Sequence, residues 1–205
     1  MLSIFPSPTF ALFWKSNQKT TMLTTHIGAC TSVETTPCIT TAQPSPTVEE
    51  VRVDMAGMKV ESKPVELVTS VGSCVAICLY DLTNKCGGLA HIMLPNSAIF
   101  PHELLPFKFA DTAVPALVRA IARLNVKAAP LYGKIAGGAN MFPNLRSDTL
   151  SIGEKNVEAV KTALAAQKIK LLAEDVGGTS GRRISFNVKT GVATIRRFQG
   201  EIKTI

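Results

Sequence analysis

Residues 69–95 read TSVGSCVAICLYDLTNKCGGLAHIMLP, and this stretch decides the fold of the chain. Along 75–80, the larger apolar residues Val75, Ile77 and Leu79 alternate with a second set, 76, 78 and 80. This period of two is typical of a β-strand. Residues 81–88 contain an asparagine and a Gly-Gly pair and are expected to form a turn, after which 89–94 forms the returning strand. The stretch therefore predicts an antiparallel hairpin.

The residues outside the hairpin predict further strands and two substantial helices. Apolar residues spaced three to four apart predict helices over 109–124 and 154–167. Strands are predicted over 51–60, 65–69, 131–136, 169–174, 183–188 and 192–198. Because most strands come as antiparallel pairs with helices between them, we expect an α+β layered sandwich of mostly antiparallel strands with two to three helices. A doubly wound parallel sheet fits this order less well.

The first 50 residues differ in composition from the rest of the chain. Residues 20–48 are rich in Thr, Ser and Pro and contain no Lys or Arg. We expect residues 1–50 to be a disordered leader or the product of a start codon placed too far upstream. The folded domain is then predicted to span 51–199, with 200–205 as a C-terminal tail.

The overall composition is that of a globular protein, with 46% hydrophobic and 18% charged residues. The apolar start at 1–14 contains two prolines and no preceding basic residue, so it matches neither a secretory signal nor a membrane helix. The odd number of cysteines, five, favours reduced thiols over a disulfide framework. We therefore expect a cytoplasmic protein without membrane insertion.

The formal net charge of +7 bears on the class of partner. Basic residues are scattered, and only Arg182-Arg183 and Arg196-Arg197 are adjacent pairs. Few aromatic residues accompany them as platforms on which bases could stack. We therefore expect no nucleic-acid partner, and a basic surface that suits an acidic protein partner.

A cysteine and a histidine on the two strands of the hairpin suggest thiolate chemistry. A thiol is mostly protonated near neutral pH, so it needs a base or a cationic neighbour to become a nucleophile. Cys74 directly follows Gly72 and Ser73, where free backbone N–H groups could face a developing oxyanion. Cys78 has the same strand parity, so the hairpin alone does not say which of the two cysteines meets His91.

Two non-catalytic interpretations compete with this one. In the first, both thiols are packed in the core and the histidine is simply hydrogen-bonded. In the second, zinc has four ligands: Cys74, Cys78, Cys86 and His91. Their spacing lacks the closely spaced C-x₂-C pairs of structural zinc sites, so we expect no metal. Nor does the chain contain a glycine-rich motif for phosphate or dinucleotide binding.

Six blocks, in this order, resemble the CheD family of chemoreceptor glutamine deamidases: GSCVAICLYD, GGLAHIMLP, KFADTA, KIAGGANMF, IGEKN and EDVGGTSGRR. The resemblance covers residues 51–198. It implies hydrolysis of the side-chain amide of particular glutamines on methyl-accepting chemotaxis receptors, with receptor methyl-ester hydrolysis as a further activity. It also implies that no cofactor is needed, and that the fold is similar to that of deamidating bacterial toxins.

The same resemblance implies roles for individual residues. Cys74 is then the nucleophile, His91 its base, and Thr69 the third member of the catalytic set, while the backbone near Gly72 and Ser73 supports the oxyanion. A CheC-type phosphatase is the expected protein partner beside the receptors. The alternative is a mainly non-catalytic protein that regulates this phosphatase.

Overall fold

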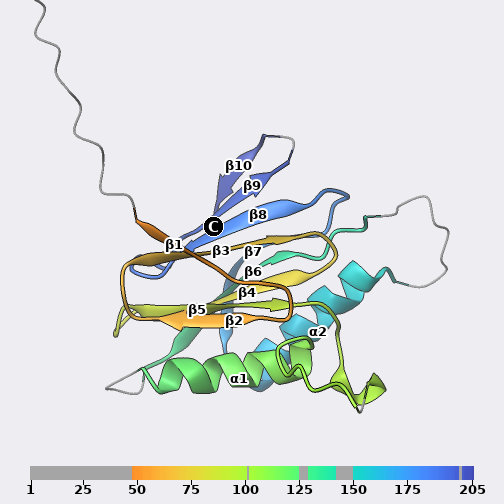
Figure 1. Ribbon diagram of the computed structural model, residues 1–205, viewed down its shortest axis with the longest axis horizontal. Coiled ribbons are helices and arrows are strands. Elements are labelled where there is room, and N and C mark those ends of the chain that lie inside the picture. The colour runs from red at the N-terminus through yellow and green to blue at the C-terminus, as the bar shows by residue number, and fades with distance from the viewer. Residues whose placement is uncertain (1–47, 101, 125–128, 142–149, 199) are drawn as a thin grey trace, which may run out of the picture. The chain divides into compact units, whose positions relative to one another are not determined.

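The computed structural model describes residues 48–100, 102–124, 129–141, 150–198 and 200–205 (Figure 1). The expected leader lies outside them, apart from its last three residues. The helices are α1 (Ala110–Ala122) and α2 (Ile152–Ala166), with a short 3₁₀ turn at Ser97–Ile99. The strands are β1 (Glu49–Arg52), β2 (Met58–Glu61), β3 (Val65–Val71), β4 (Val75–Asp81), β5 (Cys86–Ile92), β6 (Leu131–Gly137), β7 (Lys170–Val176), β8 (Arg182–Asn187), β9 (Ala193–Arg197) and β10 (Ile202–Thr204).

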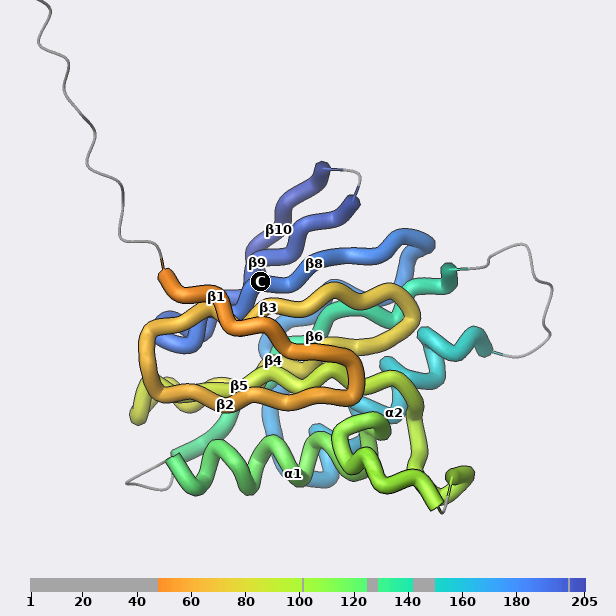
Figure 2. Tube along the Cα trace, viewed as in Figure 1, coloured from red at the N-terminus to blue at the C-terminus, as the bar shows by residue number. Residues whose placement is uncertain are grey.

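The strands form two five-stranded sheets. Their orders are β1-β3-β8-β9-β10 and β2-β5-β4-β6-β7. Only the pairs β1–β3 and β6–β7 are parallel among the described strands. The second sheet lies between the first sheet and the two helices (Figures 1 and 2). The predicted α+β layered sandwich of mostly antiparallel strands is thereby confirmed.

Strand β4 is buried on both faces and separates two apolar cores. Val75, Ile77 and Leu79 point toward the helices, where they pack with α1 side chains such as Leu117. The alternate residues Ala76, Cys78 and Tyr80 face the other sheet and pack with its core residues. Burying one Leu or Ile side chain contributes about 1.5–3 kcal/mol, so this strand anchors both layers. Its two-sided burial is also why residues 75–79 are all apolar.

Helix α2 begins at a complete capping box. The hydroxyl of Ser151 accepts a hydrogen bond from the backbone N–H of Glu154, whose carboxylate accepts one from the N–H of Ser151 at 2.7 Å. This arrangement satisfies two N–H groups that the helix itself cannot pair. It fixes the start of α2, and therefore the positions of the side chains in its first two turns.

The predicted strand 51–60 is wrong as a single element. The structure divides it into β1 and β2, which belong to different sheets. Between them the chain turns: the N–H of Gly57 donates to the carbonyl of Asp54 at 3.0 Å, and Ala56 has a φ of +53°. Both halves of VRVDMAGMKV alternate, but the apolar residues change from odd positions (Val51, Val53, Met55) to even positions (Met58, Val60), and this change of phase falls at the turn.

Both predicted ends of the domain also need correction. Strand β1 starts at Glu49, so residues 49–50 belong to the first sheet and not to a leader. Residues 200–205, expected as a tail, contain β10, which pairs antiparallel with β9. Ile205 extends this pairing by exchanging two backbone hydrogen bonds with Ala193. A strand of three residues is too short to show a periodic pattern.

Candidate active site

His91 and Thr69 come from different sheets and meet in the space between them. Thr69 lies on β3 and His91 on β5, and both side chains are buried. The hydroxyl oxygen of Thr69 lies 2.8 Å from Nδ1 of His91. The packing of one sheet on the other therefore brings together two of the three residues predicted to act in catalysis.

The Thr69 hydroxyl fixes the tautomer of the histidine ring. Its single proton is donated to the carbonyl oxygen of Val53 at 2.8 Å, so its oxygen must accept from the ring. Nδ1 of His91 therefore carries the ring proton, and Nε2 has a free lone pair. Nε2 is buried and has no hydrogen-bond partner among the described residues. A neutral imidazole with an unoccupied nitrogen is what a general base requires.

Cys74 directly precedes β4, on the face of the sheet that carries His91. The register places Ala76 opposite His91, and Cys74 lies two residues earlier on the same face. In a regular antiparallel pair such diagonal neighbours are about 7–8 Å apart, within reach of long or aromatic side chains. Cys78 lies two residues to the other side of Ala76, so the register favours neither cysteine.

Burial separates the two cysteines. Cys74 is partly exposed, whereas Cys78 is only 3% exposed. Burial raises the pKa of the Cys78 thiol to about 12, although the charge of Lys134 opposes the shift. Cys78 therefore stays protonated and inaccessible, and of the two only Cys74 can meet a substrate.

The backbone at Cys74 is held by the turn that follows β6. The N–H of Gly138 donates to the carbonyl of Cys74, and the N–H of Ala139 donates to that of Gly72, both at 2.8 Å. Gly137 has a φ of +122°, and a Cβ atom there would lie 2.2 Å from the Cys74 carbonyl oxygen. Only glycine fits this close approach. Within the described part of the chain, the N–H groups of Ser73 and Cys74 donate to no backbone acceptor.

The protonation states of the pair follow from their surroundings. Burial raises the pKa of the Cys74 thiol, and its own backbone amide offsets only part of that shift. Burial also lowers the pKa of His91 to about 4, although the charge of Asp54 opposes this. At neutral pH the site thus holds a neutral thiol and a neutral imidazole.

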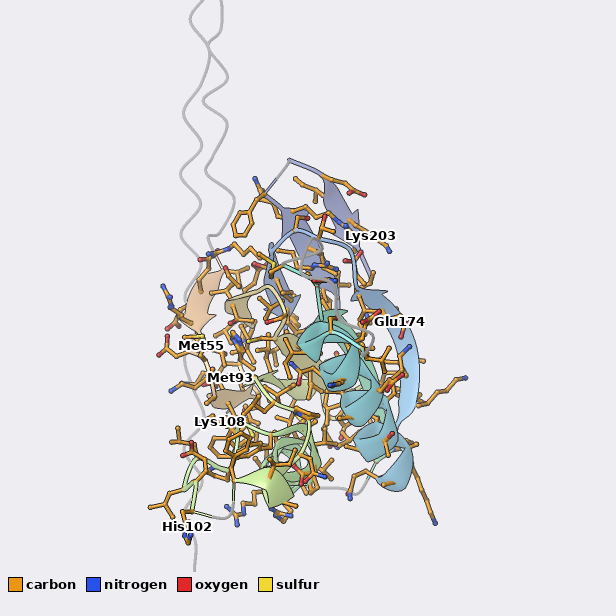
Figure 3. The ribbon with its side chains drawn as sticks, turned by 90° about the vertical axis from the view of Figure 1, so that its right-hand side faces the viewer. Met55, Met93, His102, Lys108, Glu174 and Lys203 are labelled. Carbon is orange, nitrogen blue, oxygen red and sulfur yellow. The ribbon has the colours of Figure 1, made fainter. Side chains whose placement is uncertain are left out.

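A pocket of about 270 Å³ opens onto His91 and Thr69. Both charge signs line it, with Arg52 and Arg183 as well as acidic side chains. Met55, 64% exposed, contributes to the lining and is labelled in Figure 3. Cys74 is not among the residues that line it, so this pocket adjoins the Thr69–His91 pair and not the thiol.

Sequence reasoning missed two contributors to the site. One is the backbone carbonyl of Val53, which takes the Thr69 proton. The other is Asn156 of α2, whose side-chain NH₂ donates to the carbonyls of Ser73 and Met93 at 3.0 and 2.9 Å. A carbonyl group gives no sequence signal. Asn156 lies in the quoted block IGEKN, but nothing in that block indicates a contact with the hairpin.

No group of three or more His, Cys, Asp or Glu side chains in the described part of the chain is arranged to hold a metal ion. None of the helices described is long and apolar enough to span a membrane.

We expect His91 to stay neutral, with its proton on Nδ1, until the pH falls to about 4. Its pKa is ordinarily 6.5, so the unfolded chain binds the proton first as the pH falls. Above pH 6.5 the imidazole is neutral in both states, so the burial of His91 does not lower the free energy of unfolding. Between pH 6.5 and about 4 only the unfolded chain binds the proton, and the free energy of unfolding falls progressively. Two-dimensional ¹⁵N–¹H NMR of the ring nitrogens checks this. A ring proton on Nε2, or titration near 6.5, would contradict the assignment.

Comparison with known proteins places this geometry in a family context. The family model described as CheD chemotactic sensory transduction matches residues 93–197. A protein of Desulforamulus reducens named "Probable chemoreceptor glutamine deamidase CheD" is 42% identical over 158 residues, which is 76% of this chain and 95% of the relative. Proteins of the same name are 42% identical in Clostridium kluyveri and 41% identical in Methanococcus maripaludis. These two matches cover 77% and 75% of this chain, and 99% and 98% of the relatives.

The position of these matches matters for the site. The family model begins two residues after His91. A match over 76% of a 205-residue chain, however, necessarily includes its central part. Thr69, Cys74 and His91 therefore all lie within the region shared with the Desulforamulus relative.

Proposed function

Because this chain belongs to the CheD family, we propose that it is a protein-glutamine deamidase that converts glutamines of chemoreceptors to glutamate and ammonia. The observation that carries the proposal is the free Nε2 of His91, held in the basic tautomer by Thr69 on the face that also bears Cys74. Methyl-ester hydrolysis on the same receptors would use the same groups, with methanol as the leaving group.

In the proposed first step, Nε2 of His91 takes the proton of the Cys74 thiol as sulfur attacks the carboxamide carbon of the glutamine. A C–S bond forms, and the carbonyl electron pair moves to oxygen. The N–H groups of Ser73 and Cys74, which donate to no backbone acceptor in the described residues, stabilise this oxyanion. The imidazolium is in turn stabilised by the hydrogen bond from Nδ1–H to Thr69.

In the second step, the imidazolium returns its proton to the amide nitrogen and the C–N bond breaks. Ammonia leaves, and a thioester remains on Cys74. Nε2 of His91 then takes a proton from water, whose oxygen attacks the thioester. The products are glutamate and the regenerated thiol. General acid–base catalysis of this kind contributes about 10²–10⁴-fold to such rates.

A chemoreceptor substrate of this kind implies a cytoplasmic enzyme. From the family resemblance we also propose that the fold is similar to that of deamidating bacterial toxins. A CheC-type phosphatase is the proposed second partner, and the alternative role is regulation of that phosphatase without catalysis. Binding of the phosphatase by Cys74→Ala would separate the two roles.

Thr69→Val is expected to lower kcat about 10–100-fold while Thr69→Ser stays within a few-fold of wild type. Valine removes the acceptor of Nδ1–H, and an unpaired buried donor costs about 1–3 kcal/mol. If this cost raises the activation free energy by disturbing the ring orientation, the rate falls about tenfold for each 1.36 kcal/mol, which gives the stated loss. Steady-state kinetics and thermal melts of both variants check this. Equal activity of the valine and serine variants would contradict the role of the hydroxyl.

Ammonia release from a receptor signalling fragment tests the proposed activity. We expect release that saturates with fragment concentration and disappears when the modified glutamines are replaced by glutamate. The fragment should come from the organism that supplies the enzyme, so that specificity does not mask activity. A folded protein that releases no ammonia from any matched receptor would favour the regulatory role.

A further inference from the structure

Asn156 lies in the second turn of α2 and is completely buried. Both described contacts of its side-chain NH₂ are backbone carbonyls, that of Ser73 at 3.0 Å and that of Met93 at 2.9 Å. Two acceptors fix which end of the amide carries the nitrogen. One of these residues directly precedes Cys74, and the other follows His91 by two positions.

Among the described residues, no backbone hydrogen bond joins β4 and β5 beyond the end of their pairing. Its last paired residues are Val75 and Ile92. Beyond them the N–H of Met93 donates to the carbonyl of Lys108, and the carbonyl of Cys74 accepts from Gly138. The two strands therefore separate where the nucleophile sits, and the amide of Asn156 joins them again.

The chemistry of the side chain fits this joining role. A carboxylate would place oxygen against two carbonyl oxygens, and an apolar side chain would leave both carbonyls without this donor. The Oδ1 atom of Asn156 is buried without a partner in the described residues, which is unfavourable for a polar atom. An apolar residue would avoid the unpaired oxygen but would lose both hydrogen bonds, so what the amide specifically provides is one donor group shared by the two strands.

We infer that Asn156 is a positioning residue that sets the distance between the Cys74 thiol and Nε2 of His91. The inference rests on the proposed function, because it assigns a role within the same Cys–His pair. Asn156 lies on the helix side of the sheet, whereas the pair faces the other sheet, so it acts through the backbone and touches no substrate.

The test measures the rate at which iodoacetamide alkylates Cys74, mapped by peptide mass, at neutral pH. In wild type, His91 accepts the thiol proton as sulfur attacks, so alkylation is faster than for an unassisted thiol. We expect Asn156→Ala to slow it about tenfold, to the rate of His91→Ala. The double variant should react no more slowly than His91→Ala alone, because both changes remove one interaction. On a receptor fragment, kcat of Asn156→Ala should fall about 10–100-fold with little change in KM.

The matched control is Val160→Ala, which removes a fully buried side chain from the core face of the same helix. At a temperature where every variant is folded, it should keep the wild-type alkylation rate. An unchanged or increased alkylation rate in Asn156→Ala, additive losses in the double variant, or an equal loss in Val160→Ala would overturn the inference. Alkylation needs no receptor, so its outcome is independent of whether the proposed substrate is correct.

Discussion

Replacement of Cys74 by alanine is expected to lower deamidation at least about 10⁴-fold without unfolding the protein. The thiol is the atom that bonds to the substrate, and removal of a nucleophile takes away the covalent route and not merely one stabilising contact. The side chain is partly exposed and only adjoins the core between the sheets, so its loss creates no large cavity. Ammonia release and circular dichroism of the purified variant check both parts.

Cys78→Ala is the matched control for this prediction. Cys74 and Cys78 lie on the same face of the sheet, two residues before and two residues after Ala76. Unlike Cys74, Cys78 is buried, so its replacement removes a thiol that no substrate can reach. We expect a modest loss of stability and turnover close to wild type. Activity that survives in Cys74→Ala, or disappears equally in a folded Cys78→Ala, would contradict the assignment of the nucleophile.

The second large effect concerns the carboxylate that joins the two sheets. Asp175 lies on β7 of one sheet, and its side chain is 1% exposed. It forms ion pairs with three cations of the other sheet: Arg182 of β8, Arg197 of β9 and Lys203 of β10. The Arg182 side chain is itself wholly buried and also donates to the carbonyl of Gly177. One buried anion thus compensates several positive charges.

Asp175→Asn is therefore expected to lower the free energy of unfolding by about 3–5 kcal/mol. Removing one partner of a buried pair leaves the other charge uncompensated, and here the Arg182 guanidinium remains buried. Urea denaturation checks this. The control is Glu174→Gln, next along the strand and labelled in Figure 3, whose pair with Lys161 is partly exposed and should contribute less than about 1 kcal/mol. Equal denaturation midpoints for the two variants would contradict this account.

The same carboxylate gives the stability a defined pH dependence. Burial opposes ionisation of Asp175, but hydrogen bonds from Arg197 and Lys203 and the charge of Arg182 outweigh it, so its pKa lies below 3.8. The contribution is therefore complete above the ordinary carboxyl pKa and is lost as the pH falls through the depressed value. Wild type should lose this stability on acidification below about pH 4, whereas Asp175→Asn lacks it at every pH.

Much of the fold could be predicted because its central hairpin carries a clear periodic pattern. Strand β4 matches the predicted 75–80 to within one residue. The break within 51–60 leaves a trace in the sequence, because the apolar alternation changes phase between Met55 and Met58, but the assignment of the two halves to different sheets could not be predicted. Which sheet a short strand joins is a tertiary property, and β1 and β2 are each only four residues long.

The site was less accessible from sequence than the fold. Strand parity left Cys74 and Cys78 equivalent, and the observed register leaves them so, because Ala76 lies opposite His91. Their position along the strand does separate them: Cys74 stands at the strand entrance and Cys78 deeper in the apolar run, which predicts the burial of Cys78 that the structure shows. The contact between Thr69 and His91 joins two sheets; the position of Thr69 five residues before Cys74 allows such a contact, but only the family resemblance favours it over an ordinary strand threonine.

Mass analysis of a receptor signalling fragment treated with the enzyme in ¹⁸O-enriched water tests the central claim most directly. Hydrolysis of a glutamine amide replaces NH₂ by ¹⁸OH, so we predict a gain of about 3 Da per site, against about 1 Da in ordinary water, mapped to glutamines that become glutamates. An unchanged mass for a matched receptor incubated with folded enzyme, or a gain without incorporated ¹⁸O, would contradict it.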